Sequence, residues 1–134
     1  MSELIRTKAD GSIGFGDYTL AEKTKLSDFI YDGASYKVKT FKDMTRLERN
    51  EMFIYESEPG TSVENLKVTG SRVDFDVEGD GQTQITLGLE DDAEYRVTVD
   101  GVSMGKVPTS MGGKLTLSAD LNPGRSQKIV IEKA

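Results

Sequence analysis

The chain has 134 residues, among them 17 Lys and Arg and 23 Asp and Glu, and it contains no His, Cys or Trp. Without His and Cys it cannot form a Ser-His-Asp triad, a thiol nucleophile, a disulfide, a thiolate metal site or a His-based zinc site. The net charge of −6 disfavours binding to nucleic acid or to a membrane surface, because both require a basic field. We expect one soluble, acidic domain over residues 1–134.

The N-terminal residues 1–8 lack the apolar core of a secretory signal peptide. No apolar run approaches the roughly 20 residues that a membrane-spanning helix needs. The absence of Cys is compatible with a reducing compartment. Together these features predict a cytoplasmic protein.

The first half of the chain shows a strand pattern with one ambiguous segment. Residues 11–16 are glycine-rich but match no phosphate-binding loop, and they are typical of a turn followed by a strand. Tyr36 and Val38 alternate with polar residues, and residues 52–55 form a short apolar run that suits a central strand. Residues 40–50 leave two alternatives open, a short helix capped by Thr40 or an irregular hairpin that turns at Asn50.

The second half of the chain alternates regularly between apolar and polar residues. Turn signals such as Asp-Gly and Gly-Gly separate the alternating segments. This period of two predicts half-buried strands whose inward residues are Val73, Phe75, Val77, Ile85, Leu87, Leu89, Tyr95, Val97, Val99, Leu115 and Leu117. The apolar run at residues 129–131 predicts a final strand with both faces covered.

Many short strands at this spacing predict an all-β protein. We expect an antiparallel β-sandwich, jelly-roll or immunoglobulin-like, with about 9–11 short strands and at most one short helix. Val97, Leu115 and Ile131 are expected to be buried on strands that face one core.

Two groups of acidic residues are candidate sites. Asp74, Asp76 and Glu78 alternate along one strand and therefore share one face. This pattern is typical of a solvated strand face, and whether these carboxylates bind a cation such as Ca²⁺ stays open. We expect no metal or other cofactor. The second group, at residues 90–94, coincides with a turn, so we interpret it as solvent-exposed rather than as a catalytic carboxylate pair.

Aromatic residues offer the third candidate site. Most of the ten aromatic rings are needed to fill the core of a strand protein of this size. Tyr18, Tyr31 and Tyr55 are the candidate ligand-binding residues, because exposed flat rings stack on sugars. No catalytic residue is assigned.

Several segments resemble a known class of domain. Residues 95–107, 112–118 and 124–131 resemble the C-terminal β-sandwich repeats of many bacterial carbohydrate-active enzymes, and residues 53–63 are similar to a strand and corner of the same accessory domains. The whole chain resembles a group of small, uncharacterised all-β bacterial proteins that are sometimes automatically labelled endosialidase. The resemblance implies the fold alone, because the chain is too short for a sialidase propeller and lacks Trp.

These observations favour a non-catalytic β-sandwich that acts as a binding or assembly module with a link to carbohydrates. The expected partner is a glycan or a protein. Two alternatives remain, a small carbohydrate-active enzyme that uses paired carboxylates or a tyrosine, and a homo-oligomeric structural protein whose edge strands pair between copies.

Overall fold

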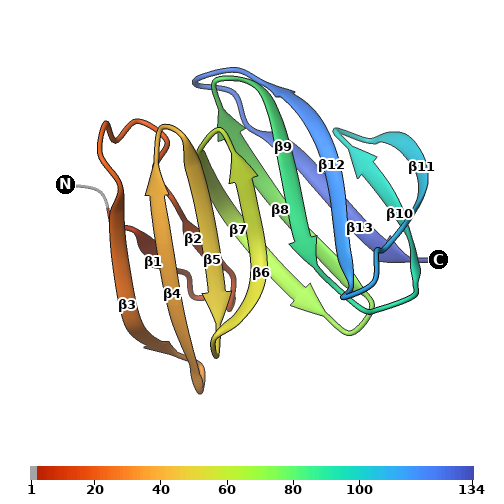
Figure 1. Cartoon of the computed structure of the whole chain (residues 1–134), viewed down its shortest axis with the longest axis horizontal. Helices are drawn as coiled ribbons and strands as arrows, with labels where there is room; N and C mark the ends of the chain where they lie inside the picture. The colour runs from red at the N-terminus through yellow and green to blue at the C-terminus, as the bar shows by residue number, and fades with distance from the viewer. Residues whose placement is uncertain (1–2) are drawn as a thin grey trace.

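The computed structural model describes residues 3–134, which form two antiparallel sheets and no helix (Figure 1). The first sheet, called sheet A, has the order β1 (Ile5–Thr7), β2 (Ile13–Phe15), β7 (Thr61–Thr69), β8 (Arg72–Gly79), β13 (Gln127–Lys133), β10 (Glu94–Val99) and β11 (Val102–Pro108). Sheet B has the order β12 (Lys114–Leu121), β9 (Gly81–Gly88), β6 (Met52–Glu58), β5 (Met44–Arg49), β4 (Ala34–Phe41) and β3 (Thr24–Tyr31).

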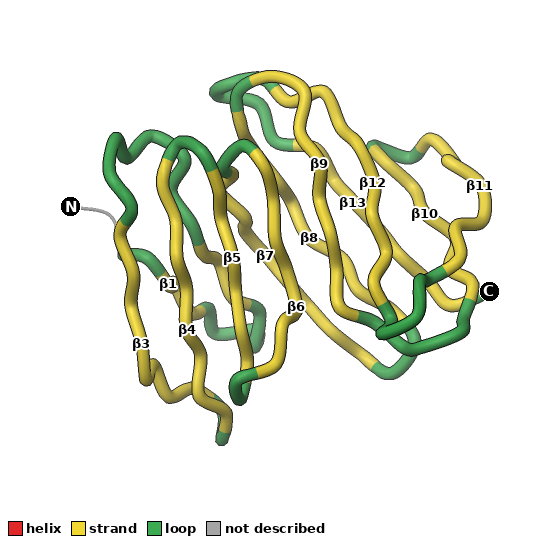
Figure 2. The backbone as a smooth tube through the Cα atoms, viewed as in Figure 1, coloured by secondary structure: helices red, strands yellow, loops and turns green. Residues whose placement is uncertain are grey.

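The two sheets lie face to face as a β-sandwich, as predicted from the sequence (Figure 1). Short loops connect the strands, mostly at the two ends of the sandwich (Figure 2). The described residues form thirteen strands, more than the nine to eleven expected, and β1 and β2 have only three residues each.

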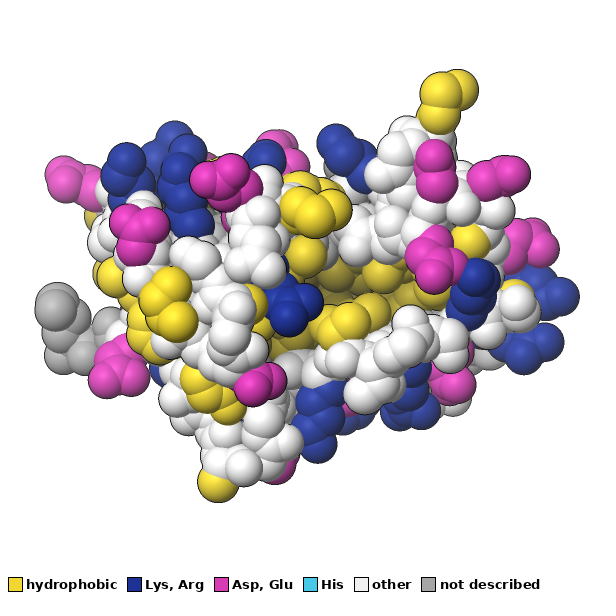
Figure 3. All heavy atoms as spheres, turned by 90° about the horizontal axis from the view of Figure 1, so that it is seen from below, with side chains coloured by type: hydrophobic (Ala, Val, Ile, Leu, Met, Phe, Trp, Pro, Cys, Tyr) yellow, Lys and Arg dark blue, Asp and Glu magenta, His cyan; other side chains and the backbone are white. Residues whose placement is uncertain are grey.

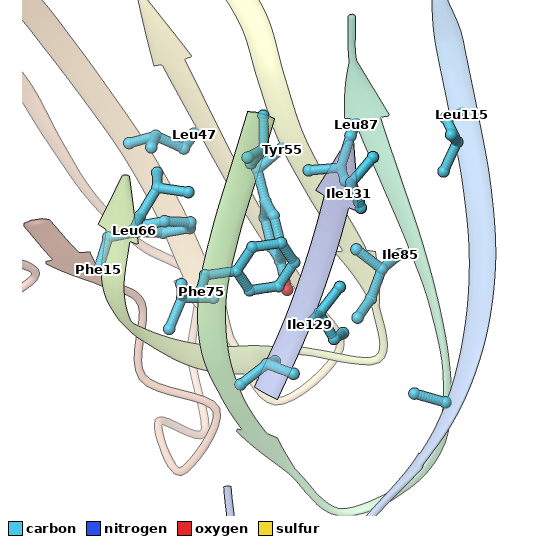
Figure 4. Close-up of a cluster of buried hydrophobic side chains, with 14 of the residues drawn as sticks. Phe15, Leu47, Tyr55, Leu66, Phe75, Ile85, Leu87, Leu115, Ile129 and Ile131 are labelled. Atoms are coloured by element: carbon cyan, nitrogen blue, oxygen red, sulfur yellow. The ribbon is translucent and has the colours of Figure 1, made fainter. Parts of the chain in front are cut away.

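The core fills the space between the sheets with the residues that the alternation marked as inward (Figure 4). Val97, Leu115 and Ile131 are buried as predicted. At the centre, the Phe15 and Phe75 rings both pack edge-on against Tyr55, with ring centroids 5.0 and 5.7 Å away. The outward-facing residues of the same strands form the surface of the molecule.

The ambiguous segment at residues 40–50 is a hairpin, so the helical alternative is wrong. β4 and β5 pair from Tyr36↔Arg49 to Phe41↔Met44, and β5 pairs with β6 on its other side. Three apolar residues spaced by three gave the helical signal, but sheet pairing on both sides of β5 satisfies its backbone. The turn at Asn50 is present, and this residue has a positive φ of 51°.

Candidate functional site

An open polar hollow on the outer face of sheet A is the candidate site, and we call it the outer basin. Its volume is about 510 Å³. Side chains from β1, β7 and β8 line it, and the loop after β2 and the segment before β13 complete its walls. Its lining includes the polar side chains of Arg6, Lys8, Tyr18, Glu64, Asn65, Asp76 and Glu78.

Strand alternation explains why these side chains meet on the outer face. Val73, Phe75 and Val77 point into the core, so Asp76 and Glu78 of β8 must point outward. The neighbouring strand β7 has a bulge between Glu64 and Lys67, and Asn65 within it has a positive φ of 56°. The bulge interrupts the alternation locally and brings the Asn65 side chain to the basin.

Glu78 lies where two distant loops meet. The Tyr18 hydroxyl donates a hydrogen bond of 2.6 Å to Glu78 Oε2, and the backbone N–H of Gly124 donates one of 3.0 Å to the same oxygen. Partial burial, together with the bond to the Glu78 carboxylate, raises the pKa of Tyr18 to about 12. Tyr18 is therefore neutral at physiological pH and held as a donor.

A second set of contacts fixes the orientation of Asn65. Its Nδ2 donates to Asp76 Oδ2 over 2.8 Å, and its Oδ1 accepts from Lys8 Nζ over 2.8 Å. Because the amide has a carboxylate on one side and an ammonium on the other, only one orientation satisfies both partners. Lys8, Asn65 and Asp76 thus form a continuous polar chain across the outer basin.

The Arg6 guanidinium is already paired within the protein. Arg6 Nε forms a 2.7 Å ion pair with Glu64, and Lys8 lies 3.5 Å from the same carboxylate. Arg6 also donates to the backbone carbonyls of Val63 and Gly16, each over 3.2 Å. These contacts leave Asp76 and Glu78 as the carboxylates of the basin that have no ion pair within the described residues.

The three carboxylates of β8 share one face, as predicted, but they have separate partners. Asp74 forms ion pairs with Arg72 at 3.1 Å and Lys128 at 3.6 Å, outside the outer basin. Asp76 and Glu78 accept hydrogen bonds from neutral donors instead. Across residues 3–134, no group of three or more acidic side chains is arranged to hold a metal ion.

The structure separates the three candidate tyrosines. Tyr18 lines the outer basin, whereas Tyr31 is half-buried on the edge strand β3, where its hydroxyl donates to the Lys8 carbonyl over 3.3 Å. The interpretation of Tyr55 as an exposed ring is wrong, because this residue is only 1% exposed. The inward side of β6 places Tyr55 in the core, and burial raises the pKa of its hydroxyl.

The acidic group at residues 90–94 lies on an exposed turn, as predicted. Glu90 forms an ion pair with Lys133, and Asp91 accepts a hydrogen bond of 2.6 Å from the Gly112 backbone. These contacts tie the turn to neighbouring segments. They do not bring two carboxylates together over a hollow.

Three residues of the outer basin, Arg6, Lys8 and Asn65, were not predicted as site residues from the sequence. Arg6 and Lys8 come from a three-residue strand and its end, and Asn65 from a bulge that no sequence pattern marked.

Comparisons of the chain with protein-family models, with curated proteins and with solved structures find no match. No helix within residues 3–134 is long and apolar enough to cross a membrane.

Proposed function

We propose that this chain is a non-catalytic binding module and that the outer basin takes a hydroxyl-rich ligand, a short glycan. The observation that carries the proposal is the Tyr18–Glu78 contact at the wall of the basin, where an aromatic ring stands beside a carboxylate that accepts hydrogen bonds. Sugar recognition combines a flat apolar ring face with acceptors for hydroxyl protons.

The charges of the outer basin favour a neutral ligand. The guanidinium of Arg6 is bound to Glu64 and to backbone carbonyls, so it has little capacity left for an anion. Asp76 and Glu78 still have free lone pairs, since each carboxylate has about four acceptor positions. A glycan hydroxyl can donate to those positions. The resemblance to accessory domains of carbohydrate-active enzymes supports the same ligand class.

A glycan-array screen of the purified chain, followed by calorimetric titration of the hits, tests the proposal. We expect Tyr18→Ala to abolish binding and Tyr18→Phe, which keeps the ring, to weaken it. Glu94→Gln is the control for Glu78→Gln, because Glu94 lies on β10 outside the outer basin. Binding that is unchanged in both Tyr18→Ala and Glu78→Gln contradicts the proposal.

A second candidate function is glycoside hydrolysis by Asp76 and Glu78. Alternate residues on a strand are about 7 Å apart, and inverting glycosidases hold their two carboxyl groups about 6.5–9.5 Å apart. However, Glu78 Oε2 already accepts hydrogen bonds from the Tyr18 hydroxyl and the Gly124 N–H, so this oxygen is occupied by contacts within the protein. Turnover of a nitrophenyl glycoside or a sialoside that Glu78→Gln removes would establish the enzyme instead.

Assembly through edge strands is a third proposal, and β11 supports it. This strand is an edge of sheet A, where Val102 and Met104 are 64% and 57% exposed. Unpaired edge strands with apolar side chains are prone to pair with another strand. Sedimentation velocity tests this: a dimer that Met104→Lys converts to a monomer supports pairing, and a monomeric parent chain contradicts it.

A further inference from the structure

The chain contains four Asp-Gly pairs, each at a turn or bend: Asp10–Gly11, Asp32–Gly33, Asp80–Gly81 and Asp100–Gly101. In such a pair the aspartate can react with the next residue, because glycine has no side chain to shield its main-chain nitrogen. The reaction requires the carboxyl carbon to approach that nitrogen. A carboxylate or an N–H that is held by hydrogen bonds is therefore protected, and the structure ranks the four pairs by their contacts.

Two of the pairs form the same kind of turn. Asp32–Gly33 connects β3 to β4, and Asp100–Gly101 connects β10 to β11, each as a two-residue loop between paired strands. The φ angles are 50° and 77° in the first loop and 49° and 80° in the second. Positive values at both positions are typical of tight hairpin turns. The two turns are thus matched in φ at both residues, and they can be compared by what contacts them.

The second turn is tied to the strand β13. Asp100 Oδ1 accepts a hydrogen bond of 2.8 Å from the Lys128 N–H, and the Asp100 N–H donates one of 2.8 Å to the Lys128 carbonyl. Arg125 lies 3.9 Å from the other carboxylate oxygen of Asp100. The carboxyl group of Asp100 cannot turn towards Gly101 without breaking these contacts.

The first turn has no such contacts. Within residues 3–134, neither the Asp32 carboxylate nor the Gly33 N–H forms a hydrogen bond or an ion pair. A Cβ at Gly33 would meet nothing within 4 Å. The turn projects from the end of the sandwich opposite the β4–β5 turn, at the bottom of Figure 1, and Figure 3 looks onto that end. Asp32 also borders an open hollow of about 290 Å³, so water reaches the turn.

The remaining two pairs have at least one reacting group held in place. Asp10 Oδ1 accepts from the Ser12 hydroxyl over 2.6 Å and from the Ser12 N–H over 3.0 Å, and the Gly11 N–H donates to a main-chain carbonyl over 3.1 Å. The bonds from Ser12 lower the pKa of Asp10 to about 2, so the protonated acid that can lose water is scarce. Gly81 pairs with Leu121 in the β9–β12 ladder, which holds its main chain.

We propose that Asp32 is a site of spontaneous modification, at which aspartate converts to isoaspartate. The main-chain nitrogen of Gly33 attacks Cγ of Asp32, and its hydrogen leaves with the carboxyl hydroxyl as one water molecule. The product is a five-membered succinimide ring. Water then adds to the ring carbonyl that was the main-chain carbonyl of Asp32 and breaks its bond to the nitrogen. That carbonyl becomes a free carboxylate, the chain continues through Cγ, and the water lost in the first step is regained.

The modification changes the length of a two-residue loop, because isoaspartate adds one methylene carbon to the main chain. β3 is the edge strand of sheet B and pairs only with β4, and Tyr31↔Ala34 is the last pair before the loop. The longer loop no longer matches this pair. We therefore expect the end of β3 to loosen. Asp32 does not line the outer basin, so this inference is independent of the glycan proposal.

Incubation of the folded chain for several weeks at mildly acidic pH, followed by peptide mass spectrometry, tests the proposal. An endoproteinase that cleaves before aspartate does not cleave before isoaspartate, so missed cleavage reports the modified fraction at each site. We expect isoaspartate to form at least about tenfold faster at Asp32 than at Asp100, because the Asp100 carboxylate must first leave its hydrogen bond. In urea the two sites should react at similar rates. Equal rates in the folded chain, or no isoaspartate at Asp32, overturn the proposal.

Variants test the role of the contacts and the effect on β3. Ser12→Ala removes the hydroxyl bond to Asp10 and should increase isoaspartate at Asp10 without changing the rate at Asp32. Asp32→Glu should stop the reaction at its turn, since the longer side chain cannot close a five-membered ring, and Asp100→Glu is the matched control. Ageing should speed hydrogen exchange at the end of β3 in the parent chain and in Asp100→Glu, but not in Asp32→Glu. Equal acceleration in all three chains overturns the assignment to Asp32.

Discussion

The two ends of the sandwich are closed in different ways, although β4, β5 and β6 run through both. At the closed end, a cluster of buried hydroxyl groups joins the sheets: Thr40, Thr45, Ser57, Thr61 and the hydroxyl of Tyr55. At the open end, opposite the β4–β5 turn, β6 borders a small apolar slot of about 70 Å³ lined by Ile54, Leu66, Val68, Val73, Leu87 and Leu89. Hydrogen-bonded hydroxyl groups close one end of the sandwich, whereas a small apolar slot remains at the other end.

The closed end shows how a polar cluster becomes a rigid structural element. Thr45 Oγ1 donates to the Thr61 carbonyl over 2.9 Å and accepts from the Thr61 N–H over 3.0 Å. No buried side-chain nitrogen or oxygen within residues 3–134 lacks a hydrogen-bond partner. The Asp17 N–H also donates to Thr40 over 2.8 Å, so the cluster positions the loop that carries Tyr18. The open end has no comparable network among the described residues.

The largest expected effect comes from adding one carbon at Gly60, in the closed end. A Cβ there would lie 1.9 Å from the Phe41 carbonyl oxygen. Because that neighbour is backbone and cannot move away freely, we expect Gly60→Ala to lose about 3 kcal/mol or more. Gly70→Ala is the control, since a Cβ at Gly70 meets nothing within 4 Å and the substitution changes only local backbone strain. Equal urea midpoints for the two variants would contradict the description of a tightly packed end.

Thr61→Val should have the next largest effect. It removes the hydroxyl that pairs with Tyr55 at 2.7 Å and with Ser57 at 2.8 Å, and it leaves both buried groups without that partner. We expect a loss of about 2 kcal/mol or more, measured by urea unfolding. Thr86→Val, on an exposed contact with Thr116, should stay within about 0.5 kcal/mol of the parent chain. A similar loss in both variants would show that the cluster has no special role.

The third prediction concerns alkaline pH. The pKa of Tyr18 is raised from its usual 10.0 to about 12, so above pH 10 the folded state keeps a proton that the unfolded state releases. The stabilisation is complete below pH 10 and is lost as the pH rises towards 12. Tyr18→Phe should therefore reduce the loss of stability over this range. An unchanged slope of unfolding free energy against pH would contradict the raised pKa of Tyr18.

The smallest effect is expected at the open end. Val68 is 65% exposed at the edge of the slot, so Val68→Ala should change the unfolding free energy by less than about 0.5 kcal/mol. Differential scanning calorimetry compares it with Val63→Ala, which removes a fully buried side chain of the same strand. A loss at Val68 as large as that at Val63 would mean that the slot is closed in solution.

The sequence predicted the strands and the inward face because alternation depends only on neighbouring residues. Phe75, Ile85 and Val97 are buried where the period of two placed them. Tyr55 lies in the apolar run at residues 52–55, which was predicted as a central strand, yet its ring was interpreted as exposed, because a tyrosine hydroxyl is compatible with either location. Its partners, Thr61 and Ser57, satisfy the hydroxyl in the core.

The site was harder to predict, because it depends on contacts between distant segments. Glu78 was identified from its strand, but its bonds to Tyr18 and Gly124 span 60 and 46 residues. Asn65 and Ile54 reach their positions through bulges, which shift the side-chain pattern by one residue. A bulge follows from the pairing of two strands, so one strand's sequence does not specify it.

The position of β13 also determines the order in which sheet A can assemble. Residues 127–133 lie between β8 and β10, and the β10–β11 hairpin joins the rest of sheet A through them. Until this segment has emerged from the ribosome, β8 and β10 each present an unpaired edge. Such edges recruit other chains at high concentration. Nascent chains that stop before residue 127 are therefore the species most exposed to misassociation, and chaperone binding should be strongest at that stage of synthesis.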